Sequence, residues 1–205
     1  MSVLPVFSTQ YFGCIYFYHC IIQHTDILFE TQEYYIKQTY RNRQYILTAN
    51  GVMPLIIPVV HHSHQEKMID KEICFKEKWH KKHYTAIVSA YKNAPYFEYY
   101  ADELLSPLLH PPTNKLFEFN FLIIQKVLSL LNCNVHFHFT KEYYPNYEKD
   151  FRQAFHKNIH LPDSLKVPYL QVFSDRFKFQ ENLSIIDAIF NLGPEVKTYL
   201  ASKSQ

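Results

Sequence analysis

Cations cluster in a short polar run between two apolar segments of the chain. The run is Lys37-Gln38-Thr39-Tyr40-Arg41-Asn42-Arg43, and it stands where a strand is expected to begin. An arginine guanidinium presents two parallel donors to a phosphate or a carboxylate, so Arg41 and Arg43 could form an anion site. The same charges could instead protect an exposed edge strand from pairing with another chain. The residues alone leave both interpretations open.

Imidazole side chains gather in two neighbouring segments. Three stand in one polar loop and two follow on a predicted helix: His61, His62, His64, His80 and His83. Adjacent loop histidines seldom converge tetrahedrally and no cysteine is spaced to help, so we predict a solvated loop and no metal site. His83 is the better candidate for a general base, because Trp79 four residues earlier places it toward the buried side of the helix. A core histidine with simply paired ring nitrogens is the more frequent case and is the favoured interpretation.

Two further groups of reactive or aromatic side chains have an ordinary structural explanation. Cys14 falls near the start of a predicted helix, where a thiolate would be stabilised, but no histidine stands near it in sequence. We therefore predict that Cys14 packs in the core. An aromatic group surrounds Pro95 and consists of Tyr91, Tyr96, Phe97, Tyr99 and Tyr100. This group could stack on a sugar ring, although core packing is favoured.

Composition excludes several classes of protein. The 205 residues suit a single domain, 1–205, and their 47% hydrophobic content is too high for a disordered chain. A net charge of +2 is too small for a nucleic-acid-binding face. With only three glycines, neither a P-loop nor a dinucleotide-binding fingerprint can be formed, and we predict no cofactor. Four scattered cysteines, no signal peptide and no apolar stretch of roughly 20 residues predict a cytoplasmic protein without a membrane span.

The elements that would position these side chains begin with a strand, a helix and a second strand. Periodicity predicts a strand at 3–8, a helix at 11–22, and strands at 27–30, 44–48, 52–60 and 69–75. Short links favour parallel pairing of the first two strands. Asn50-Gly51 between two β-rich runs is the strongest short signal for a β-hairpin.

The second half of the chain is predicted to be largely helical. We expect helices at 79–91, 96–109, 115–131 and 185–192, a weak helix at 149–155, and strands at 135–140 and 168–173. Ser184 is placed to cap the last of the long helices, and Gly193-Pro194 is typical of a stop followed by a new helix. The sequence therefore predicts a mixed α/β protein with a Rossmann-like strand-helix-strand start, a β-hairpin and a largely helical second half.

Several blocks of residues, taken in order, resemble the WbqC-like family. In the first half these are Gln10-Tyr11-Phe12, Tyr16-Phe17, the cationic run at 37–43, and Asn50-Gly51 leading to Ile57-Pro58-Val59. Downstream they are Trp79-His80-Lys81-Lys82-His83, Ala90-Tyr91, Pro95-Tyr96-Phe97, and the segments 182–187 and 190–195. The blocks cover most of the chain. The chain differs from the family pattern in carrying Gly13 where many members have proline, and in lacking most of an insertion before the last strand.

The resemblance implies a protein of bacterial loci that build O-antigen and other surface polysaccharides, with no activity that carries over residue by residue. Such loci supply activated sugars, so the leading hypothesis is a transferase acting on a nucleotide-linked or lipid-linked sugar or amino sugar. The alternative is a non-catalytic glycan-assembly or sugar-nucleotide-binding protein. Turnover of an activated donor would support the first, and stable binding without turnover would support the second.

We predict that side chains from distant parts of the chain converge on one cleft at the carboxyl ends of the strands, where α/β proteins bind ligands. The catalytic candidates are His83 and Asp187. The substrate-binding candidates are Gln10, Lys37, Arg41, Asn42, Arg43, Trp79 and Tyr91. In this hypothesis an arginine holds the phosphate of the donor, Trp79 packs on an apolar ring face, and His83 takes a proton from the attacking group. Asp187 has an alternative role, the neutralisation of an arginine in the core.

Overall fold

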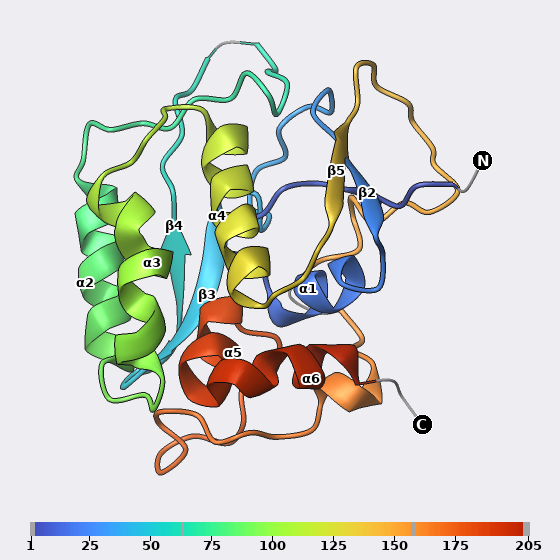
Figure 1. Ribbon diagram of the computed structural model, residues 1–205. Coiled ribbons are helices and arrows are strands. Elements are labelled where there is room, and N and C mark those ends of the chain that lie inside the picture. Colours follow the sequence, from blue (N-terminus) through green and yellow to red (C-terminus); the bar gives the residue numbers. More distant parts are fainter. Residues whose placement is uncertain (1–2, 63, 157–158, 203–205) are drawn as a thin grey trace.

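The structure is a computed structural model that describes residues 3–62, 64–156 and 159–202. Strands and helices occur in both halves, as Figure 1 shows, and the fold is mixed α/β as predicted. The strands are β1 (Val6–Phe7), β2 (Asp26–Phe29), β3 (Arg43–Thr48), β4 (Gly51–Ile56) and β5 (His136–Phe139). The helices are α1 (Ile15–Ile21), α2 (Trp79–Tyr91), α3 (Phe97–Leu109), α4 (Leu116–Leu130), α5 (Ile185–Leu192) and α6 (Val196–Ala201), with short 3-10 turns at Asp163–Leu165 and Gly193–Glu195.

A small parallel sheet is the first structural unit. β1 pairs with β2 in parallel, with Val6 opposite Leu28, and β5 adds to the other side of β2 in the same direction. Helix α1 makes the crossover between β1 and β2, so the predicted strand-helix-strand start is confirmed. On the free side of β1, Asp150 forms one further parallel bridge with Val6. Four chain segments therefore run side by side and end at one edge.

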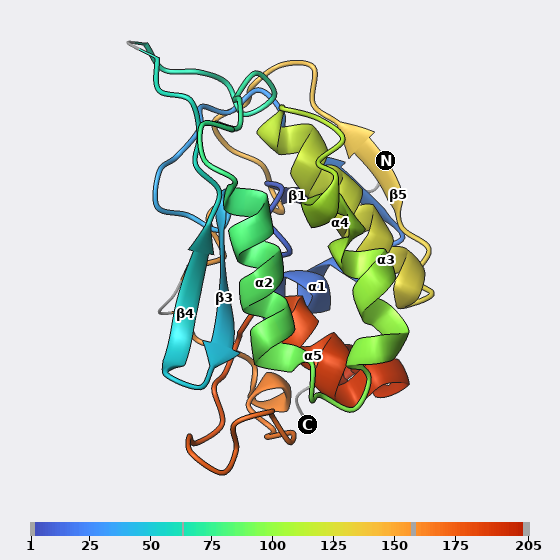
Figure 2. The same cartoon turned by 90° about the vertical axis from the view of Figure 1, so that its left-hand side faces the viewer.

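The β3–β4 hairpin is separate from the parallel sheet and packs beside α2 (Figure 2). Thr48 pairs with Gly51 at its tip, and Gly51 adopts a φ of +99°, which favours glycine. The hairpin predicted from Asn50-Gly51 is therefore confirmed. Side chains alternate along β3, so Gln44 and Ile46 point into the core while Arg43 and Tyr45 lie on the outer face.

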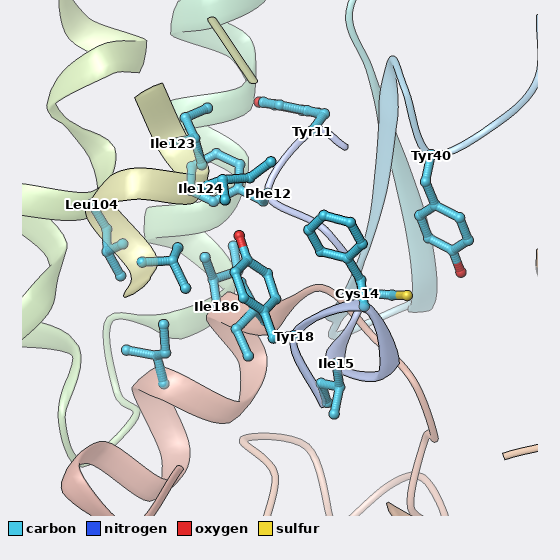
Figure 3. Packing of buried hydrophobic residues seen from close by; sticks show 14 of the residues in the cluster. Tyr11, Phe12, Cys14, Ile15, Tyr18, Tyr40, Leu104, Ile123, Ile124 and Ile186 are labelled. Carbon is cyan, nitrogen blue, oxygen red and sulfur yellow. The ribbon is translucent and has the colours of Figure 1, made fainter. Parts of the chain in front are cut away.

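Helix α4 is the central element of the core. On one side Phe121 packs against Phe137 and Phe139 of β5, and on the other α4 contacts α3 (Figure 1). The helix predicted at 115–131 is confirmed, and its observed ends each differ from the predicted ends by one residue. The aromatic residues after β1, Tyr11 and Phe12, fill the space beside α4 (Figure 3). Cys14 is a buried free thiol in this region, and burial raises its pKa, in agreement with a packing role.

Three predicted elements are wrong. The segment 69–75 is extended but forms only isolated bridges, because its amides bond to different partners: Ile69 N donates to Thr31 O, and Ile73 N donates to Asn114 O. The segment 149–155 is not a helix, since its backbone bonds to Val6 at the sheet edge. The segment 168–173 has no regular structure up to residue 171 and then enters a turn. For 69–75 and 149–155, the periodicity reflected partial burial, whereas the backbone conformation depends on hydrogen bonds to distant segments.

The junction between α5 and α6 gives a stability prediction. Gly193 adopts a φ of +55°, and a Cβ atom at this position would collide with the Tyr96 ring. Gly193→Ala is expected to lower the free energy of unfolding by about 2 kcal/mol, from overpacking together with backbone strain. Gly51→Ala is the matched control, because its φ is also positive but its Cβ would meet open space, so about 1 kcal/mol is expected. Urea unfolding of both variants would contradict the packing argument if the two losses were equal.

Candidate functional site

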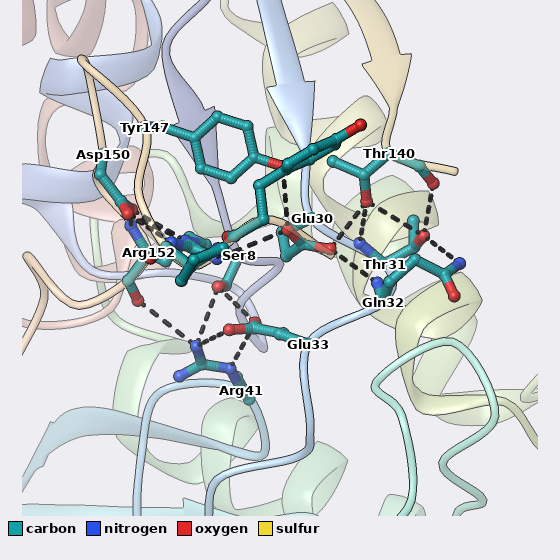
Figure 4. A network of polar contacts seen from close by, with 12 residues as sticks. Ser8, Glu30, Thr31, Gln32, Glu33, Arg41, Thr140, Tyr147, Asp150 and Arg152 are labelled. Carbon is teal, nitrogen blue, oxygen red and sulfur yellow. Dashed lines mark hydrogen bonds and ion pairs between the residues drawn. The ribbon is translucent and has the colours of Figure 1, made fainter. Parts of the chain in front are cut away.

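Polar side chains follow each parallel segment at the edge where the strands end. Ser8 follows β1, Glu30 and Thr31 follow β2, Thr140 follows β5, and Arg152 follows the Asp150 bridge. Figure 4 shows these residues joined in one network of hydrogen bonds and ion pairs. The carboxyl edge of a parallel sheet is where α/β proteins place ligands, so this edge is the first candidate region.

One half of the carboxyl-edge network is built on Arg41. Its Nε donates to Glu33 Oε1 at 3.0 Å and its Nη2 to Glu33 Oε2 at 2.8 Å, which is a two-point ion pair. Nη2 also donates to Ser8 Oγ at 2.9 Å, and the hydroxyl of Ser8 donates to Glu33. Arg41 is 3% exposed. The guanidinium therefore forms its hydrogen bonds within the protein and links the loop after β2 to the end of β1.

The other half of the network is built on Glu30, which is fully buried. Its carboxylate accepts hydrogen bonds from Thr140 Oγ1 at 2.7 Å and from the backbone amide of Gln32 at 2.7 Å. Arg152 Nη1 lies 3.5 Å from Glu30 Oε2. The guanidinium carbon of Arg152 also lies over the Tyr147 ring, 4.9 Å from the ring centroid. Each charge in this half of the network has a partner, so the network fixes the strand ends relative to one another.

An open pocket adjoins this edge, and we call it the histidine pocket. It is a cavity of about 510 Å³ lined by Tyr34, Tyr35, Ile36, Lys37, His61, His62, His64, Gln65, Glu66 and Lys71. The chain passes directly from Glu33 of the network into its wall, where Tyr35 N donates to Glu66 O at 2.9 Å. Two ammonium groups and three imidazoles line the cavity, together with a single carboxylate. The pocket therefore has the lining expected for an anionic ligand.

Contacts within the histidine pocket hold two of its side chains. The Lys71 ammonium is buried, donates to Val60 O at 2.6 Å and to Glu66, and lies 5.4 Å from the centre of the Tyr35 ring. His62 Nε2 lies 3.4 Å from the other oxygen of Glu66. No group of three or more possible metal ligands occurs in the described ranges. The arrangement suits binding of an anion together with proton transfer by His62.

His83 and Trp79 lie on α2 beneath the hairpin, in the core. His83 is 7% exposed, and its Nδ1 shares a hydrogen bond with the Tyr11 hydroxyl at 2.9 Å. Burial, with a smaller contribution from the neighbouring His80, lowers the pKa of His83 to about 4. Trp79 packs edge-on against His83, and its Nε1 is buried without a partner in the part of the chain that is described. His83 is therefore a neutral, paired core histidine at pH 7.

Tyr91 and Asp187 form a second buried polar contact. The Tyr91 hydroxyl donates to Asp187 Oδ1 at 2.9 Å and accepts the amide of Leu47 at 3.1 Å. Asp187 Oδ2 accepts from the Tyr169 hydroxyl and from Gln171 Nε2. Burial raises the pKa of Asp187, and the hydrogen bonds to it offset part of that effect. Among the described residues no cation pairs with Asp187, so it does not neutralise an arginine.

Comparison with protein-family models decides the family. The model of the WbqC-like protein family matches residues 9–165, more than half of the chain. This chain belongs to the WbqC-like family. Comparisons with curated proteins and with solved structures gave no match. In this WbqC-like protein the matched range contains the whole histidine pocket and nearly all of the carboxyl-edge network, whereas Asp187 lies outside it.

The predicted site residues of the WbqC-like protein occupy four separate places. Arg41 belongs to the carboxyl-edge network and Lys37 to the histidine pocket, which adjoin. Arg43 lines a different cavity, on the outer face of the hairpin. The remaining candidates are buried in the core: Gln10, Asn42, Trp79, Tyr91, His83 and Asp187. Gln10 Oε1 accepts the amide of Cys14, and Asn42 Nδ2 donates to Ile57 O, so both amides hold backbone segments.

The sequence did not reveal most of the side chains that hold these predicted site residues in position. Glu30 was visible as a carboxylate at the end of a predicted strand, and the loop histidines were visible as a cluster. Glu33, Lys71 and Arg152 gave no signal in the local pattern. Glu33 and Lys71 pair with side chains eight and five residues away because their loops fold back, and Arg152 reaches Glu30 across the sheet edge. No helix in the described ranges is long and apolar enough to cross a membrane.

Proposed function

We propose that this WbqC-like protein is a transferase that binds a phosphate-bearing activated sugar or amino sugar in the histidine pocket, during assembly of bacterial surface polysaccharide of the O-antigen type. The observation that carries the proposal is the pocket lining, which combines two ammonium groups and three imidazoles with a single carboxylate, Glu66. The resemblance of the chain to its family supports the biological setting. Four free cysteines suit the cytoplasm, where we place the reaction.

The pocket has the size and the free donors that a charged donor substrate needs. Its volume of about 510 Å³ lies within the usual range of ligand pockets, roughly 300–1,000 Å³. An ammonium has three donors, and Lys71 uses two of them on Val60 and Glu66, which leaves one for a phosphate oxygen. Lys37 is exposed at the rim and adds a second positive charge. In this proposal Arg41 positions the pocket wall through Glu33 and does not touch substrate.

The proposed transfer uses His62 as the base. The acceptor hydroxyl or amine attacks the sugar carbon that carries the phosphate, the bond from that carbon to the phosphate oxygen breaks, and the phosphate leaves with both electrons of that bond. The acceptor proton passes to His62, which Glu66 orients. His62 takes the role predicted for His83, because a buried histidine with a pKa of about 4 is a weak base and lies outside this pocket.

A non-catalytic sugar-nucleotide-binding protein is the second candidate function. One observation favours it: Glu66 bonds Lys71 closely, while its distance to His62 is 3.4 Å. A carboxylate already committed to an ammonium orients an imidazole less firmly. Binding of a nucleotide sugar without turnover in the presence of acceptors would establish this second function.

His62→Ala separates these two functions, and Lys37→Ala tests whether the histidine pocket is the binding site. Lys37→Ala is expected to weaken binding of a nucleotide sugar by about fivefold, the value for an exposed charge worth roughly 1 kcal/mol. Lys81→Ala removes an exposed lysine from α2 and should leave affinity unchanged. His62→Ala should lower turnover by about 10²-fold or more with little change in affinity. Calorimetry with a panel of nucleotide sugars, followed by product analysis by mass spectrometry, checks both, and equal affinities for the two lysine variants would refute the pocket.

A further inference from the structure

A second cavity lies on the outer face of the hairpin, and we infer that it binds a small ring compound carrying one negative charge. We call it the hairpin pocket. It has a volume of about 510 Å³, and its wall is formed by alternate residues of β3 and β4 together with the segment 180–183. None of its lining residues belongs to the histidine pocket. The inference is therefore independent of the proposed function.

Arg43 is the residue from which we infer that the ligand is negatively charged. The chain has four arginines, and three of them are ion-paired: Arg41 with Glu33, Arg152 with Asp150 and Glu30, and Arg176 with Asp175. Within the described ranges Arg43 makes no ion pair, and its Nε is buried without a hydrogen-bond partner. The Arg43 side chain lines the hairpin pocket, so a carboxylate bound there can accept charge-assisted hydrogen bonds from the accessible part of its guanidinium.

The walls of the hairpin pocket indicate a ring with an apolar face. Tyr40 and Tyr45 meet edge to face with their centroids 5.6 Å apart, and Val52 and Pro54 continue the surface on β4. Tyr45 and Pro54 are direct cross-strand partners, so this wall belongs to a regular hairpin and not to a mobile loop. Aromatic and proline surfaces of this kind pack against the apolar faces of sugars and aromatic rings.

Glu181 limits the charge that the pocket accepts. It is an exposed carboxylate that lines the same pocket and makes no ion pair among the described residues. The Glu181 carboxylate would repel a phosphate dianion more strongly than a ligand with one carboxylate. A single carboxylate can still form charge-assisted hydrogen bonds with Arg43. The ligand class is therefore a monocarboxylate on a ring, either an acidic sugar of the uronic type or an aromatic acid.

The test measures binding of glucuronate, benzoate and neutral glucose by chemical-shift changes in isotope-labelled full-length protein. We expect changes on β3 and β4 with one of the two acids and none with glucose. Arg43→Gln should weaken that binding at least tenfold, as loss of a charge-assisted bond requires. Glu181→Gln should strengthen it severalfold, because a like charge is removed. Lys37→Ala and Arg176→Gln should leave it unchanged.

The decisive result is a decrease in affinity for Arg43→Gln together with an increase for Glu181→Gln. Glu181 is exposed and has no ion pair among the residues that the structure describes, so its removal should leave the fold intact. The Glu181→Gln result therefore stands even if Arg43→Gln lowers stability. The inference is overturned if neither acid shifts the hairpin resonances, if both pocket variants bind equally well, or if glucose binds as tightly as the acids. A loss of hairpin binding in Lys37→Ala would show that the two pockets are one site. Failure of nucleotide-sugar binding alone would affect only the proposed function.

Discussion

Replacing Arg41 with methionine is expected to lower the free energy of unfolding by about 3–5 kcal/mol, the cost of leaving a buried charge without its partner. Glu33 is 5% exposed and receives two hydrogen bonds from this guanidinium, at 3.0 Å and 2.8 Å. Without Arg41, its carboxylate keeps the Ser8 hydroxyl but has no cation within ion-pair distance in the described part of the chain. The measurement is urea unfolding at pH 7, followed by circular dichroism.

Two comparisons decide whether burial of the Arg41–Glu33 pair is the cause. Arg176→Met breaks the exposed pair with Asp175, whose side chains are 59% and 73% exposed, and less than about 1 kcal/mol should be lost. A double variant, Arg41→Met with Glu33→Leu, should recover most of the stability, because two apolar side chains can replace a buried ion pair. An Arg41→Met variant as stable as Arg176→Met would contradict the assignment of Arg41 to a buried structural role.

Elements with strong periodicity and clear end signals could be predicted from the sequence. Helix α2 begins and ends at the predicted residues, and α5 does so too, with Ser184 before it and Gly193 after it. Even there the capping argument needs correction, because the Ser184 hydroxyl donates to Gln44 Oε1 in the hairpin and not to the helix. Segments without their own partner strand, such as 69–75, were mistaken for strands since alternation reports burial and not pairing.

The candidate site was less predictable than the fold, and Arg41 and Arg43 show why. They are two residues apart, and both appeared as possible phosphate ligands. Arg41 turns inward to Glu33, eight residues earlier, whereas Arg43 starts β3 and points to the outer face of the hairpin. Residue type gave the charge correctly in both cases. The direction of Arg43 depends on strand register and that of Arg41 on its contact with the Glu33 carboxylate, and the local pattern of residue types contains neither.

His83 gives the second large expected effect, a loss of stability in acid. Its pKa is about 4 in the folded protein and about 6.5 in an unfolded chain, so the unfolded chain binds the proton first as the pH falls. The stability from a neutral His83 is complete above pH 6.5 and is lost progressively between about pH 6.5 and pH 4. The slope should be about 1.4 kcal/mol per pH unit, for a total of about 3 kcal/mol.

His83→Gln isolates this contribution, because the amide can still bond the Tyr11 hydroxyl but does not titrate. Other groups change protonation in the same range, and Asp187 acts with the opposite sign since burial raises its pKa. The quantity to measure is therefore the difference in urea unfolding free energy between wild type and His83→Gln at pH 7, 5.5 and 4.5. We expect wild type to lose about 2–3 kcal/mol more than the variant over this range. His110→Gln, at an exposed histidine after α3, should follow wild type at each pH. A pH-independent difference would mean that His83 can be protonated in the folded state and is open to solvent, which would restore it as a candidate base.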